Sequence, residues 1–374
     1  MSRRSYQFDK KSISFEPSFP TCSCRDRQNK PSSMPHSLLI WTDIGLYCPA
    51  GDFYIDPMCS ASNPVGNAVI THAHSDHARR GASRYYCASR GAGLLRARIG
   101  RSQAIEGIPY QQRWKLGPVT LSFHSAGHIL GSSQVRMEYD GEVWVASGDY
   151  KRDSDPSCDP FESVSCDTFI TEATFGTPKY VWDKSAQHGI DIWQWWNENS
   201  RRGLNSILFG YSLGKTQRIL AELAPFADRP ILVHSTMTAL IQCYQEEGIK
   251  LAFTRPLTAH DRPVGDLILA PPSFFNEERS SRFSPFRTAF ASGWMTDEYS
   301  GPHYDRGFTL SDHADWNDLH RSIDESGAKR VFVMHRNEGA LVRSLRSKGI
   351  EAHGVEALRP ERYARLPQPN LSLF

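Results

Sequence analysis

The chain has 374 residues, of which 39% are hydrophobic and 22% are charged, and its formal net charge is +2. This length allows two domains, or one large domain with an insertion. No apolar run approaches the roughly 18 residues that a membrane-spanning helix needs. The eight cysteines contain no C-x-x-C pair, which favours reduced thiols and a cytoplasmic protein without a membrane partner.

The first segments predict an extension followed by short strands. Residues 1–37 are polar and without periodicity, so we expect a disordered extension. Apolar runs at 46–48 and 53–55 predict strands, and the second run leads directly to Asp56. The next run, 68–70, predicts a buried strand that ends in a polar loop.

That loop, Thr71–His77, reads THAHSDH and is the most informative stretch of the chain. Within six residues it contains His72, His74, Asp76 and His77. Imidazole and carboxylate are the ligands that zinc and similar metals prefer, and a loop fixed to a strand end can direct several of them at one point. The loop predicts a metal site; the alternative is a polar surface loop.

An arginine-rich segment follows the loop. Residues 79–101 contain seven arginines, Arg79, Arg80 and Arg84 among them, and no acidic residue. Such a cluster raises the local positive potential and favours a polyanion near the site. A solvated helix face is the alternative, because residues 88–99 have a helical pattern.

Several later strands also end at a single ionisable residue. The strand predicted at 119–123 leads to His128, the hairpin predicted at 134–145 leads to Asp149, and the strand at 168–171 leads to Glu172. In a layered αβ sandwich such strand ends meet at one edge, so these side chains can converge. Taken singly, each such residue is better explained as a turn or cap residue.

The pattern changes near Pro178. A helix predicted at 185–199 is followed by alternating strands and helices, which indicates a separate αβ unit. The segment GYSLGKT, 210–216, lacks the spacing of a phosphate-binding loop, although Lys215 remains a candidate phosphate contact. The last part returns to strand ends with histidines, at His313 in SDHAD and at His335 in VMH.

Through these residues the chain resembles the metallo-β-lactamase superfamily and, more narrowly, its β-CASP nuclease branch. Asp56, HAHSDH, AGHILGS and SGDY are similar to the four superfamily motifs, and TEATFG, SDHAD and VMH to the three motifs of the branch. The closest resemblance, through GLYCPAGDFYIDP, ITHAHSDHAR, SGDYKR, DTFITEATFG and FASGWM, is to the bacterial ligase-associated DNA exonuclease group, sometimes labelled an mRNA 3′-end processing factor.

The resemblance implies an α/β fold, a four-layer αββα metallo-β-lactamase sandwich with an inserted αβ β-CASP domain. The first part of the lactamase-like domain is expected at 38–177, the inserted domain at 178–300 and the second part at 301–374. In this branch the extra unit interrupts the lactamase-like domain, which fits the change of pattern near residue 178.

The resemblance also implies two divalent metal ions, Zn²⁺ first and Mn²⁺ as the alternative, that activate a water to attack a phosphodiester. One ion is expected on His72, His74 and His128, the other on Asp76, His77 and His335, with Asp149 bridging. His313 is the expected general acid, oriented by Glu172, and Asp56 is expected to brace the histidine loop. The expected guides of the nucleic-acid backbone are Arg79, Arg80, Arg84, Lys151 and Arg152.

The function implied first is a DNA exonuclease acting on single strands or DNA ends in repair, with a DNA ligase and a helicase as candidate partners. The alternative is an RNA processing or decay nuclease, because a histidine at the position of His335 is typical of the branch's RNA-processing members. A small-molecule metallo-hydrolase is the third reading, and the inserted unit and arginine cluster argue against it.

Overall fold

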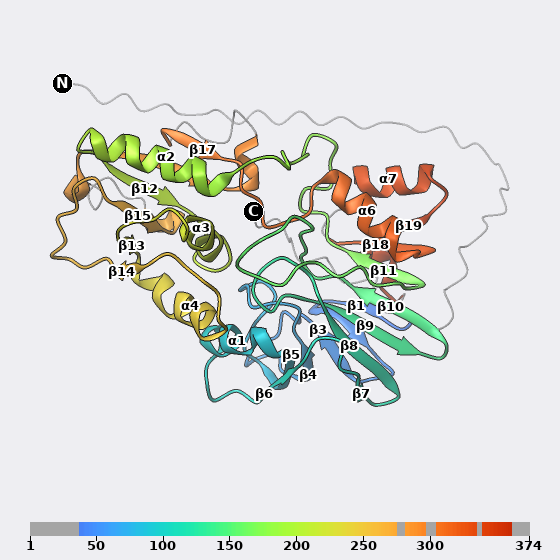
Figure 1. Ribbon diagram of the computed structural model, residues 1–374. Helices are drawn as coiled ribbons and strands as arrows, with labels where there is room; N and C mark the ends of the chain where they lie inside the picture. Colours follow the sequence, from blue (N-terminus) through green and yellow to red (C-terminus); the bar gives the residue numbers. More distant parts are fainter. Residues whose placement is uncertain (1–36, 275–280, 297–303, 335–338, 361–374) are drawn as a thin grey trace, which may run out of the picture. The chain divides into compact units, whose positions relative to one another are not determined.

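The computed structural model describes residues 37–274, 281–296, 304–334 and 339–360, which form three β-sheets with helices (Figure 1). Residues 1–36, where we expected a disordered extension, lie outside the described residues, and so does His335. Among the helices that the structure describes, none combines the length and apolar character needed to cross a bilayer.

The first sheet has six strands in chain order, antiparallel from β1 to β3 and parallel from β3 to β6. These strands are β1 (Ile40–Thr42), β2 (Gly45–Cys48), β3 (Phe53–Ile55), β4 (Val65–Val69), β5 (Ala82–Ala88) and β6 (Ile105–Ile108). The second sheet has seven strands in the order β19-β18-β11-β10-β9-β8-β7. Its members are β7 (Trp114–Leu116), β8 (Val119–Ser125), β9 (Ser133–Tyr139), β10 (Glu142–Ala146), β11 (Thr168–Thr171), β18 (Arg330–Val333) and β19 (Glu351–Gly354).

These two sheets pack face to face and are covered by helices on their outer sides. Phe53 and Val69 of the first sheet share one buried cluster with Phe123 and Val135 of the second. On the outer side of the first sheet lies α1 (Ala92–Ile99), entered through the 3₁₀ turn η1 (Ser89–Gly91). On the outer side of the second sheet lie α6 (Trp316–Ser326) and α7 (Ala340–Ser347) (Figure 1). The predicted four-layer αββα sandwich is therefore confirmed.

The third sheet is built from the part of the chain between the two halves of the sandwich. Its six strands are all parallel, in the order β14-β13-β15-β12-β16-β17. The strands are β12 (Asn205–Phe209), β13 (Ile231–Val233), β14 (Thr254–Pro256), β15 (Leu267–Ala270), β16 (Phe286–Ala291) and β17 (Arg306–Phe308). Three helices cover one face: α2 (His188–Arg201), α3 (Lys215–Leu223) and α4 (Ser235–Glu246).

The pairing of the third sheet shows how far the inserted sheet extends along the chain. Strand β17 pairs in parallel with β16, with Ala291 opposite Phe308. The inserted sheet thus reaches Phe308, whereas the inserted domain was expected to end at residue 300. Helix α4 also contacts the sandwich, because a Cβ at Gly93 of α1 would lie 3.8 Å from Cys243 Sγ, and Figure 1 shows the two helices side by side.

Candidate metal centre

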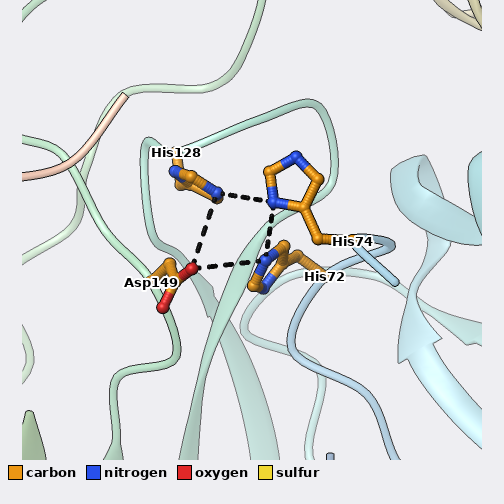
Figure 2. Close-up of side chains that lie close together, drawn as sticks. All are labelled: His72, His74, His128 and Asp149. Carbon is orange, nitrogen blue, oxygen red and sulfur yellow. Dashed lines mark hydrogen bonds and ion pairs between the residues drawn. The ribbon is translucent and has the colours of Figure 1, made fainter. Parts of the chain in front are cut away.

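Three histidines and one aspartate converge where β4, β8 and β10 end (Figure 2). His74 Nδ1 lies 3.0 Å from His72 Nε2 and 3.1 Å from His128 Nε2. Asp149 Oδ2 lies 3.6 Å from His72 Nε2 and 3.9 Å from His128 Nε2. The four ligand atoms fall within 4.8 Å of one another, so residues separated by up to 77 positions in sequence form one group.

The opposite ring nitrogens of two of these histidines face backbone carbonyls. His74 Nε2 is 3.2 Å from the Leu213 carbonyl, and His128 Nδ1 is 2.6 Å from the Asp312 carbonyl. Because a carbonyl oxygen can only accept, the nitrogen beside it carries the proton. The nitrogen that faces the centre then presents its lone pair, as a metal ligand must.

The third histidine is held through Thr71. The Thr71 hydroxyl donates to Asp56 Oδ2 at 2.5 Å, and the same hydroxyl oxygen lies 3.0 Å from His72 Nδ1. The only hydroxyl proton of Thr71 is committed to Asp56, so Thr71 accepts the proton of His72 Nδ1. His72 Nε2 therefore also directs a lone pair at the centre.

The electrostatics of the group suit a divalent cation. Burial lowers the pKa of His72, His74 and His128, so these imidazoles are neutral at neutral pH. Burial by itself raises the pKa of Asp149, but the neighbouring His77 outweighs it and holds that pKa well below its usual range. Three neutral imidazole lone pairs and one carboxylate at one point are the donor set that zinc and related metals bind.

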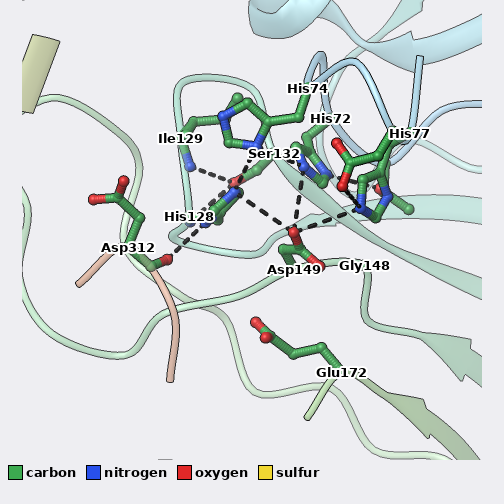
Figure 3. Close-up of polar contacts among 12 residues, drawn as sticks. His72, His74, His77, His128, Ile129, Ser132, Gly148, Asp149, Glu172 and Asp312 are labelled. Atoms are coloured by element: carbon green, nitrogen blue, oxygen red, sulfur yellow. Dashed lines mark hydrogen bonds and ion pairs between the residues drawn. The ribbon is translucent and has the colours of Figure 1, made fainter. Parts of the chain in front are cut away.

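A second group begins at His77 and shares Asp149 with the first. His77 Nε2 lies 3.5 Å from Asp149 Oδ2 and 3.7 Å from Asp76 Oδ2. Burial lowers the pKa of His77, yet Asp149 and Asp56 outweigh this and raise it well above its ordinary value. The negative potential at this position favours a cation. Asp149 Oδ2 thus lies between two histidine groups, where a ligand shared by two ions would be (Figure 3).

Asp56 holds residues of both groups in position through hydrogen bonds. It accepts hydrogen bonds from the Thr71 amide at 2.8 Å, from the Thr71 hydroxyl and from His77 Nδ1 at 2.8 Å. Its φ of 45° is in the left-handed region, which aspartate tolerates better than most residues. Gly148 has a φ of 56°, and a Cβ there would lie 2.7 Å from Thr71 Cβ. The glycine therefore lets the loop bearing Asp149 approach the histidine loop.

His313 and Glu172 form a pair next to the centre. His313 Nδ1 lies 2.9 Å and 3.1 Å from the two carboxylate oxygens of Glu172, and Glu172 Oε1 accepts from the Tyr150 amide. Burial lowers the pKa of His313, but Glu172 outweighs this and raises it to about 9. The His313 ring centroid is 4.7 Å from that of His128. A charged imidazole, fixed at one nitrogen, therefore stands beside the metal ligands.

The inserted unit contributes directly to this arrangement. Gly214, at the start of α3, approaches so closely that a Cβ there would lie 3.6 Å from His74 Nε2. Lys215 is 2% exposed, and its ammonium lies 2.8 Å from Asp312 Oδ1. Arg218 donates to the Ser311 carbonyl at 2.6 Å. Lys215 thus faces a buried aspartate, which corrects its reading as a candidate phosphate contact.

These supports were not predicted from the sequence. The Leu213 and Asp312 contacts use backbone carbonyls, which carry no sequence signal. The charges of Lys215, Arg218 and Asp312 are visible in the sequence, and Asp312 lies in the SDHAD motif, but their pairing depends on the packing of α3 against the sandwich.

The basic residues divide into two sets. Six of the seven arginines between 79 and 101 are exposed, and Arg98 Nε donates to the carbonyl of Ala73 in the histidine loop at 3.1 Å. Lys151, by contrast, is 1% exposed and ion-paired with Asp155. The Arg152 side chain is 10% exposed and pairs with Glu325 at 2.7 Å. The predicted backbone-guiding role of Lys151 and Arg152 is therefore corrected, because both cations are already paired inside the fold.

The fold and the centre together define an αββα protein with a histidine and aspartate group that could hold a metal ion. Comparison with known proteins agrees with this class. The chain is 32% identical over 318 residues, 83% of its length, to a "Probable DNA ligase" of Opitutus terrae. It is 26% identical over 183 residues to an "RNase J-like protein" of Methanocaldococcus jannaschii and 27% identical over 118 residues to "Endoribonuclease YSH1" of Kluyveromyces lactis.

These matches cover 30%, 42% and 15% of the respective relatives, so the chain spans less than half of each. No family model matches the chain. Among solved structures, a protein of unknown function from Enterococcus faecalis V583 aligns with a TM-score of 0.49 and 12% identity, over 71% of this chain and 74% of that one. The αββα fold and these relatives fit the metallo-β-lactamase superfamily and, within it, the β-CASP branch.

Proposed function

We propose that the protein is a metal-dependent nuclease that hydrolyses phosphodiester bonds, and that it is a DNA exonuclease acting in repair. One observation carries the proposal: Asp149 of the metal-ligand group, Glu172 and His313 offer atoms within 4.8 Å of one another. A hydrolase of this kind needs both a site for metal ions and a proton donor for the leaving group.

The proposed ligands follow the two histidine groups. His72, His74 and His128 would hold one ion and Asp76 and His77 the other, with Asp149 shared; His335, outside the described residues, is proposed as a further ligand of the second ion. When bound, two divalent ions, Zn²⁺ or alternatively Mn²⁺, lower the pKa of a water and offset the charge of the phosphate.

The proton for the leaving oxygen is assigned to His313. Its Nδ1 is committed to Glu172, so the proton available for donation is the one on Nε2. Glu172 is 2% exposed and keeps this ring oriented throughout. Asp56, through His77 and Thr71, holds the ligand nitrogens at fixed angles.

DNA is the first candidate substrate because the relative that matches over 318 residues carries the name of a DNA ligase. A DNA ligase and a helicase of the same pathway are the candidate partners. RNA is the second candidate, since the two other relatives are named for RNA cleavage. The exposed arginines around the histidine loop suit the phosphate backbone of either polymer.

The test is cleavage of matched end-labelled DNA and RNA single strands by the purified chain, with Zn²⁺ or Mn²⁺ and with a chelator. We expect metal-dependent shortening of DNA and loss of activity in His128→Ala. His124→Ala is the matched control, because His124 lies in β8, the strand that leads to His128, and pairs with Glu162 instead of joining the centre. Faster RNA cleavage would favour the second candidate, and no cleavage of either polymer would refute the proposal.

A further inference from the structure

Four aromatic side chains gather beside His313 without a part in the proposed chemistry. The Phe175 ring centroid is 6.0 Å from that of His313 and 4.7 Å from that of Trp294. Tyr180 lies 5.5 Å from Trp294, and Trp182 lies 4.8 Å from Phe175. We refer to Phe175, Tyr180, Trp182 and Trp294 as the aromatic cluster.

Trp294 is the exposed member of this cluster. It is 37% exposed, whereas Phe175, Tyr180 and Trp182 are between 2% and 8% exposed. Among the nine tryptophans of the chain, all of which are described, the other eight are buried or half-buried. Part of the Trp294 indole is therefore accessible to a ligand, next to a cluster that packs against His313.

The chain fixes Trp294 firmly. It lies in the 3₁₀ turn η4 (Gly293–Thr296), directly after β16 and Ser292. A Cβ at Gly293 would lie 2.6 Å from Phe175 Cζ and 3.1 Å from Ser311 Cβ. The turn is therefore pressed between the loop that follows Glu172 and the loop that bears His313. A rigid ring is what a stacking surface requires, because ordering it costs little entropy on binding.

We infer that Trp294, backed by Phe175 and Tyr180, is the stacking surface for an unpaired nucleobase next to the scissile phosphate. This inference rests on the proposed nuclease function and adds its substrate class: nucleic acid with unpaired nucleotides at the reacting end. Every base has a π-face, so stacking on an aromatic side chain is sequence-tolerant. A paired base inside a duplex has no free face to offer, which makes single strands or frayed ends the substrates.

The experiment measures KM and kcat on a labelled single-stranded DNA 20-mer and on the same strand with an abasic site near the reacting end. Trp294→Ala should raise KM by roughly 5- to 150-fold, the range that loss of one base–aromatic stack produces. Trp294→Phe should retain most of the affinity. Phe253→Ala is the matched control, because Phe253 is 72% exposed and lies next to β14 of the inserted sheet.

The abasic site should raise the KM of the wild type as much as Trp294→Ala does. It should not raise the KM of the Trp294→Ala variant any further. Unchanged KM in a folded Trp294→Ala protein, or additive effects of the variant and the abasic site, would overturn the inference while leaving the nuclease proposal standing. If the wild type cleaves nothing, the nuclease proposal fails. The inference is then tested by binding: the DNA 20-mer is labelled with fluorescein, and its affinity is measured by fluorescence anisotropy. Equal affinity of the wild type and Trp294→Ala for this strand would refute the inference.

Discussion

Replacement of Lys215 by methionine tests how the inserted unit supports the centre. Lys215 is 2% exposed and Asp312 is 6% exposed, with 2.8 Å between the ammonium and Asp312 Oδ1. Lys215→Met keeps the volume but leaves the Asp312 carboxylate buried without its nearest cation. Removal of one partner of a buried pair typically costs about 3–5 kcal/mol. Because Arg218 Nη1 remains 3.8 Å from Asp312 Oδ1, we expect the lower end, about 3 kcal/mol.

The same substitution should also lower the affinity of the centre for metal. The Asp312 carbonyl accepts the His128 Nδ1 proton at 2.6 Å, so displacement of this loop releases a metal ligand from its orientation. Loss of such a support typically lowers metal affinity about 10- to 100-fold. The assays are urea unfolding with circular dichroism for the free energy of unfolding and competition with a chromophoric chelator for zinc affinity.

Two further variants make the result decisive. Lys348→Met is the matched control: its ammonium lies 3.4 Å from Asp324 Oδ2, and both side chains are about half exposed, so this pair contributes at most about 1 kcal/mol. The double variant Lys215→Met with Asp312→Asn removes the uncompensated charge and should recover part of the loss. A cost below about 1 kcal/mol for Lys215→Met, or a double variant no more stable than the single one, would refute the reasoning.

Three other outcomes are expected. His313→Ala should slow cleavage by roughly 10²- to 10⁴-fold with bound metal unchanged by mass spectrometry; a parallel loss of metal would make His313 a ligand instead. Asp56→Asn should lower zinc affinity about 10- to 100-fold, because it weakens the hold on His77 and Thr71; unchanged affinity in the chelator competition would remove that supporting role. Asp76→Ala should abolish cleavage while the melting temperature of the metal-free protein stays within a few degrees of wild type, and wild-type turnover would contradict the second metal position.

The sandwich could be predicted from sequence because its strands are short apolar runs separated by clear turns. The hairpin predicted at 134–145 is β9 and β10, with Asp140 and Gly141 at positive φ in its turn. The arginine-rich segment was less informative. It contains the strand β5, which the helical pattern of its second half concealed. The extent of the inserted sheet could not be predicted, because a three-residue strand, β17, carries too little signal to show which sheet it joins.

The candidate metal ligands could be predicted from the sequence because imidazole and carboxylate groups are rare at successive strand ends. His72, His74, His128 and Asp149 meet as the strand-end pattern predicted. The sequence does not show in which direction each side chain points. Lys151 follows Asp149 closely, yet its ammonium turns inward to Asp155, and nothing in a linear pattern distinguishes an inward from an outward cation.

The most direct test of the central claim is the metal content of the chain measured together with its cleavage of single-stranded DNA and RNA. We expect about two divalent ions per chain, loss of cleavage on chelation, recovery on return of Zn²⁺ or Mn²⁺, and loss of both metal and cleavage in Asp149→Asn. Cleavage at the untreated rate by the metal-free protein, or by Asp149→Asn, would contradict the account.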